Sequence, residues 1–84
     1  MIKLDKMIIS RHARKQIKWR RITEKEAGEV ISNPDRVEDA IKGRKNAFKL
    51  IGQRLLKITY TVENDSIIII TAMVRKEKNH ENRI

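Results

Sequence analysis

One histidine near the start of the chain, His12, is the side chain best suited to acid–base chemistry, because histidine ordinarily titrates near neutrality. Cleavage of an RNA backbone needs a base for the 2′-hydroxyl and an acid for the leaving oxygen. It also needs cations that stabilise the charge developing on the phosphate. Arg20, Arg54 or Lys57 could supply those cations if the fold brings them to His12. A histidine with a purely structural role is the alternative.

Positive charge is concentrated around that histidine. The stretch from Ser10 to Thr23 carries six arginine and lysine residues and no acidic residue. Residues 42–62 form a second basic stretch, and an acidic stretch separates the two. This clustering, with a net charge of +9 and a pI of about 10.3, is typical of a protein that contacts phosphates. The candidate nucleic-acid contacts are Arg11, Arg14, Lys15, Lys18, Arg21, Arg44, Lys45, Lys49 and Lys57.

Two aromatic residues are candidates for stacking on bases, namely Trp19 and Tyr60. Tyr60 lies on the apolar side of an expected strand, so we predict that it packs in the core. The chain has no cysteine, and its two histidines lie far apart in sequence, so we expect no metal site and no cofactor. Nucleotide-binding and catalytic-triad motifs are absent from the sequence.

Length and hydropathy indicate one soluble domain over residues 1–84. The longest apolar run, Ile67–Ile70, is far too short to span a bilayer, and the start of the chain lacks the apolar stretch of a secretory signal. We therefore expect a cytoplasmic protein without membrane contact. The polar residues 75–84 are expected to fray or to form a short helical extension.

Two helices are expected to position the first basic stretch. Ser10 is a suitable N-cap for a helix over Arg11–Arg20. At about 100° per residue, Ala13 and Ile17 form its apolar stripe, and His12, Gln16 and Arg20 form a polar edge expected to border a groove.

The second helix begins with a capping box of Thr23 and Glu26. It runs over Glu24–Ser32 and ends at Asn33-Pro34, because the residue before proline avoids the helical region.

Beyond Pro34 the apolar residues alternate, which predicts strands over residues 36–42, 46–51, 55–62 and 67–74. The last strand is nearly all apolar and is expected to be covered on both faces. Met1–Ile9 could be a lead-in or a short edge strand. The prediction is an α+β domain, with two N-terminal helices packed on one face of an antiparallel sheet of about four strands. A cationic groove is expected between the second sheet face and the first helix.

Several motifs, in this order and spacing, resemble a family of small bacterial and archaeal proteins grouped with the RelE/ParE and BrnT type toxins of toxin–antitoxin systems. They are S-R-H-A from Ser10, Arg20 followed by Ile22-Thr23, Asn33-Pro34, G-Q-R ending at Arg54, and I-I-I-I-T-A from Ile67. The resemblance implies a RelE-like fold and metal-independent mRNA cleavage. It also implies functional roles for His12, Arg20, Arg54 and Thr71. Gln16 departs from the pattern, which has an arginine there.

Three hypotheses follow. The first is an RNA-directed, toxin-like endoribonuclease whose partners are mRNA, ribosome-bound or free, and an antitoxin protein. The second is a nucleic-acid-binding module without catalytic activity. The third is an interaction domain with the basic surface of a thermophile protein. A homodimer is compatible with each. Only the first hypothesis requires His12.

Overall fold

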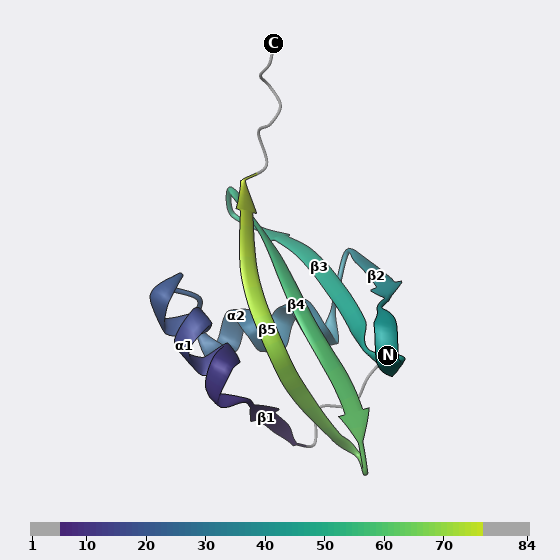
Figure 1. The fold of residues 1–84 in the computed structure, drawn as a ribbon. Coiled ribbons are helices and arrows are strands. Elements are labelled where there is room, and N and C mark those ends of the chain that lie inside the picture. The colour runs from purple at the N-terminus through teal and green to yellow at the C-terminus, as the bar shows by residue number, and fades with distance from the viewer. Residues whose placement is uncertain (1–5, 77–84) are drawn as a thin grey trace.

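The computed structural model describes residues 6–76 and has an α+β fold in which two helices precede most of the sheet (Figure 1). In chain order, the elements are β1 (Met7–Ile9), α1 (Arg11–Trp19), α2 (Glu24–Ser32), β2 (Arg36–Asp39), the 3-10 turn η1 (Ile41–Gly43), β3 (Lys45–Ile51), β4 (Arg54–Glu63) and β5 (Ser66–Lys76).

Both predicted helix starts are confirmed. The Ser10 hydroxyl accepts the N–H of Ala13 at 3.1 Å. At α2, the Thr23 hydroxyl accepts the N–H of Glu26 at 2.9 Å, and the Glu26 carboxylate accepts the N–H of Thr23 at 3.0 Å. The first helix ends one residue earlier than predicted, because Arg21 has a left-handed φ of 58° that turns the chain away.

The sheet has five strands in the order β1-β5-β4-β3-β2, which corrects the prediction of four antiparallel strands. The additional strand is β1, which pairs in parallel with β5 over Met7–Ile9 and Ile67–Ile69. The other neighbouring pairs are antiparallel, as predicted. A strand of three residues between Lys6 and Ser10 is too short for its alternation to be recognised in the sequence.

Two strand ends differ from the prediction by more than one residue. Strand β2 stops at Asp39, because Lys42 and Gly43 adopt left-handed φ values of 60° and 73° in η1. Strand β5 extends through Arg75 to Lys76, so the first two residues of the expected polar tail belong to the sheet. The predictions for residues 77–84 lie outside the described part of the chain.

Both helices pack on the same face of the sheet, with α1 against β5 and α2 against β3 and β4. Alternate residues of β4 point into this layer, among them the fully buried Leu56, Ile58 and Tyr60. The prediction that both faces of β5 are covered is wrong for residues 6–76, since the helices lie on one side only. We call the opposite side the open sheet face.

Candidate nucleic-acid interface

Helix α1 presents a cationic surface that carries no acidic residue. Ala13 and Ile17 are buried against the sheet, which turns the remaining part of the helix circumference toward solvent. The exposed side chains there are Arg11, His12, Arg14, Lys15, Lys18 and Trp19, and we call them the α1 face. Arg14 is partly neutralised by an exposed ion pair with Glu24 at 3.4 Å.

Gln16 and Arg20 of the predicted polar edge attach α1 to β5 and do not line a groove, which corrects the sequence-based expectation, while His12 is exposed. The N–H of Ala72 donates to the Gln16 side-chain oxygen at 2.9 Å, and the Arg20 Nε donates to the Ala72 carbonyl at 3.3 Å. The Ser10 hydroxyl also donates to the Ile70 carbonyl at 3.3 Å. These three side chains bond to the β5 edge just beyond the residues that pair with β1.

The two aromatic candidates are separated by the fold. Tyr60 is 1% exposed and belongs to the core, as predicted. Trp19, in contrast, is 78% exposed at the end of α1. The Arg20 guanidinium lies 5.3 Å from the centroid of the Trp19 ring. A large exposed ring beside cations is suited to stacking on a nucleic-acid base.

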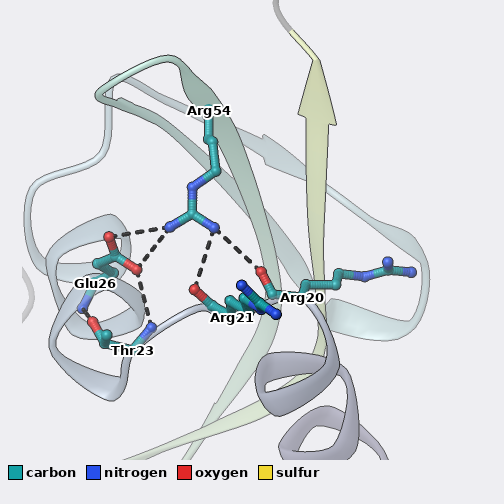
Figure 2. A network of polar contacts seen from close by, with 5 residues as sticks. All are labelled: Arg20, Arg21, Thr23, Glu26 and Arg54. Atoms are coloured by element: carbon teal, nitrogen blue, oxygen red, sulfur yellow. Dashed lines mark hydrogen bonds and ion pairs between the residues drawn. The ribbon is translucent and has the colours of Figure 1, made fainter.

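Arg54, a predicted catalytic cation, forms a clamp within the protein (Figure 2). Its Nη2 donates to both carboxylate oxygens of Glu26, at 3.0 and 3.2 Å. Its Nη1 donates to the carbonyls of Arg20 and Arg21, at 3.2 and 3.3 Å. The Thr23 N–H, together with the charge and hydrogen bonds of Arg54, lowers the pKa of Glu26. Arg54 therefore joins β4 to the turn between the helices.

The three predicted catalytic residues do not form one cluster. His12 lies in the first turn of α1, whereas Arg20 follows its last residue, so about 12 Å of helix rise separates their backbones. The Arg54 guanidinium contacts the Arg20 carbonyl at that far end. In Figure 2 the Arg20 side chain points away from Arg54. His12 and Arg54 are therefore not placed to hold the same phosphate.

The basic residues of the strands lie apart from α1, so the expected groove between the second sheet face and α1 does not form. Lys57 pairs in register with Phe48 and Met73 on the open sheet face. Lys45 forms an ion pair of 2.6 Å with Asp39, and this hydrogen bond lowers the pKa of Asp39.

Two further predicted contacts lie near the turns of the sheet. Lys49 is 3.7 Å from Asp35, and its side chain is only 17% exposed. Arg44 follows η1 and is partly buried, and its N–H donates to the Ile41 carbonyl. Lys49 and Arg44 therefore do not extend the α1 face. Arg21, which follows α1, is exposed beside that face.

Sequence reasoning overlooked Phe48 and the pairing of Glu26 with Arg54. Phe48 is buried on the open sheet face between the Arg36 guanidinium at 4.5 Å and the Lys57 ammonium at 6.0 Å from its ring centroid. Its alternation with the core residue Ala47 was a signal that it faces away from the helices. The role of Glu26 as the partner of Arg54 depends on a contact between distant segments and left no local signal.

Residues 6–76 contain no group of three or more histidine, cysteine, aspartate or glutamate side chains placed to hold a metal ion. The helices α1 and α2 have nine residues each, and no helix in this part of the chain is long and apolar enough to cross a membrane.

Comparison with curated proteins and comparison with solved structures each find no match. The resemblance to RelE/ParE and BrnT type toxins therefore stays a prediction. A family model described as a domain of unknown function, DUF4258, matches residues 9–74, a range that begins in β1 and ends in β5. Since this match covers most of the chain, the protein belongs to the DUF4258 family.

Proposed function

We propose that this protein binds single-stranded or structured RNA, and that the α1 face is the main contact surface. The observation that carries the proposal is the composition of that face, in which four cations and an exposed tryptophan occur without an acidic residue. Cations on one helix side bind phosphates and release counterions. Trp19 adds a stacking surface that accepts any base.

The docking of α1 supports this assignment. An isolated helix of nine residues is marginal in water, so its geometry depends on what it packs against. Ala13 and Ile17 supply the apolar contact, while Gln16 and Arg20 bond to β5. None of these bonds uses the cations of the α1 face. Those cations are therefore held on a fixed support, and among residues 6–76 all of them except Arg14, which pairs with Glu24, stay free for a ligand.

RNA cleavage, as in a toxin countered by an antitoxin protein, is the second candidate function, and the exposure of His12 on the α1 face favours it. His12 lies one helical turn from Lys15, so a phosphate held by Lys15 would be near the imidazole. In this mechanism His12 is the general acid or base. Arg54 is then a positioning residue, because its guanidinium is engaged with Glu26 and two carbonyls.

Binding can be tested with a fluorescein-labelled single-stranded RNA, by anisotropy over a range of salt concentrations. Each lost phosphate contact on a single strand reduces the slope of log K against log salt by about 0.7. We expect a slope smaller by about 1.4 for Lys15→Gln/Lys18→Gln. The matched control Lys42→Gln/Arg44→Gln, which removes the same charge elsewhere, should leave the slope nearly unchanged. Equal effects of the two double variants would contradict the assignment of α1.

Stacking has its own readout, because Trp19 is the single tryptophan of the chain. RNA should quench its fluorescence, and Trp19→Ala should weaken binding by about 1–3 kcal/mol. Fluorescence that does not respond to saturating RNA would exclude stacking at this position.

Cleavage is tested separately by expressing the protein in cells and following mRNA integrity. His12→Ala should reduce the rate of cleavage by about a hundredfold or more. Its RNA affinity should stay within about twofold of that of the wild type. Lys42→Gln serves as the control variant for expression level. If the wild type does not cleave, the protein is a binding module, and if His12→Ala cleaves like the wild type, His12 is not the catalytic residue; the binding proposal stands in both cases.

A further inference from the structure

The open sheet face carries a cluster of apolar and cationic side chains near the β3–β4 turn. No helix of residues 6–76 covers this side, and in Figure 1 α2 passes behind β4 and β5. The strand register places two rows of neighbouring side chains here, because residues directly opposite each other share a face. One row contains Arg36, Phe48, Lys57 and Met73, and the next contains Leu50, Leu55 and Arg75.

This cluster surrounds a hollow of about 290 Å³ with apolar walls. It is lined by Phe48, Leu50 and Leu55 and by the charged residues Asp35 and Arg36. Leu50 is 45% exposed, and Met73 in the neighbouring row is 38% exposed. A hollow of this size lies at the lower limit of sites that enclose a small ligand. It is large enough for an inserted amino-acid side chain.

The charges around the hollow favour an acidic occupant. Arg36 is paired with Glu38 at 3.3 Å, whereas the cations Lys57 and Arg75 have no ion-pair partner among residues 6–76. Asp35 is the single carboxylate in the lining, and it already accepts the N–H of Leu50 at 2.9 Å.

Two other occupants fit less well. A second copy of a chain with a net charge of +9 would bring like charges together at Lys57. An RNA base would need the Phe48 ring, which is 4% exposed beneath Arg36.

We propose that this hollow is a docking site for an acidic peptide segment of a partner protein, with one large apolar side chain inserted between Leu50 and Leu55 and carboxylates placed against Lys57 and Arg75. The anchor residue buries the exposed apolar side chains, and the carboxylates give Lys57 and Arg75 ion-pair partners. This inference is independent of RNA binding, because the α1 face and the hollow share no residue.

The test uses the full chain and two fluorescein-labelled synthetic peptides. In the first peptide, Leu-Phe is flanked on each side by three Glu or Asp residues; in the second, Ser-Ser replaces Leu-Phe. The protein should bind the first peptide at least about tenfold more tightly in an anisotropy titration, since the two peptides carry the same charge and differ in the anchor. Equal affinity for both would overturn the proposal.

Matched variants locate the site. Leu50→Gln and Lys57→Gln should each weaken binding of the Leu-Phe peptide by about tenfold or more. Val37→Gln changes an apolar residue of similar exposure, 43%, on the other side of the sheet, and Lys15→Gln removes a charge on α1. Both controls should stay within about twofold of the wild type. Thermal unfolding of each variant verifies that the fold is retained.

Three further outcomes would overturn the proposal. If Lys15→Gln weakens binding of the Leu-Phe peptide as much as Lys57→Gln does, the affinity reflects the net charge of the protein and no defined site. If Leu50→Gln weakens RNA binding more than peptide binding, the hollow is part of the surface that contacts RNA. If sedimentation shows a dimer that Leu50→Gln dissociates, the occupant is a second copy of this chain.

Discussion

The clamp formed by Arg54 and Glu26 predicts that Arg54 acts mainly on stability. The substitution Arg54→Met keeps the apolar stem and removes all four guanidinium hydrogen bonds. Exposed ion pairs contribute about 0–1 kcal/mol and hydrogen bonds to charged groups about 1.5–3 kcal/mol. The side chains of Arg54 and Glu26 are 35% and 26% exposed, so we expect an intermediate loss of about 2 kcal/mol.

For a domain of this size, that loss corresponds to a decrease in Tm of about 8–16 °C. Urea and thermal unfolding followed by circular dichroism measure the loss. A double-mutant cycle with Glu26→Gln should give a coupling of about 1 kcal/mol. Arg14→Met is the control, because Arg14 pairs with Glu24 at 3.4 Å in an exposed contact and should cost less than about 0.5 kcal/mol.

Arg54→Lys distinguishes a clamp from a phosphate contact. Lysine keeps the charge but lacks the planar fork that reaches a carboxylate and two carbonyls together. If Arg54 is a clamp, Arg54→Lys loses most of the stability that Arg54→Met loses, while RNA affinity measured well below the Tm changes little. Unchanged stability in both variants, or a coupling near zero, would refute this reasoning.

The same contact has a pH signature. The pKa of Glu26 is lowered in the folded state, by the Thr23 N–H first and by Arg54 next. A lowered pKa means that the stabilisation is complete above the pKa of the unfolded chain and is lost as the pH falls through the folded pKa. In Glu26→Gln the unfolding free energy should therefore decrease less than in the wild type as the pH falls through the acid range. A profile that is identical in the variant would contradict the role of Glu26.

Three further predictions concern single positions. Burial raises the pKa of Tyr60, so its stabilising contribution is complete below the ordinary tyrosine pKa and is lost at more alkaline pH. Absorbance of the single tyrosine should show later ionisation in the folded protein than in urea, and Tyr60→Phe should resist alkaline unfolding. Arg21→Gly should raise the unfolding free energy by about 1 kcal/mol relative to Arg21→Ala, because Arg21 has a φ of 58°. Asp65→Gly should stabilise the β4–β5 hairpin by up to about 1 kcal/mol, since Asn64 and Asp65 both have positive φ and Asn-Gly is the favoured pair for such a turn. Urea unfolding checks both glycine variants, and a loss of stability in either would contradict the backbone argument.

The parts of the fold that were predicted correctly depend on local signals. Ser10 and the pair of Thr23 and Glu26 cap their helices through neighbours three residues away, so the sequence itself contains the bonded partners. The alternation of Leu56, Ile58 and Tyr60 likewise identifies the buried side of β4 without knowledge of the neighbouring strands.

The incorrect parts depend on contacts between distant segments. The partner of β1 is β5, some sixty residues away along the chain, and a three-residue strand does not encode that pairing. Arg54 was expected to face a phosphate because its partner Glu26 was assigned only to the capping box. The apolar composition of β5 correctly indicated burial on the helix side and could not show that the other side is open.

The docking of α1 gives a physical reason for the residue at position 16, where the pattern that the chain resembles has an arginine. The Gln16 oxygen accepts the Ala72 N–H while Arg20 donates to the Ala72 carbonyl, so together they bond both backbone groups of one residue as a neighbouring strand would. An arginine has only donors and could not accept that N–H. Gln16 is thus a docking residue, and the missing arginine removes a charge from the edge that faces β5. The cations that stay available for a ligand are those on the opposite, exposed side of α1.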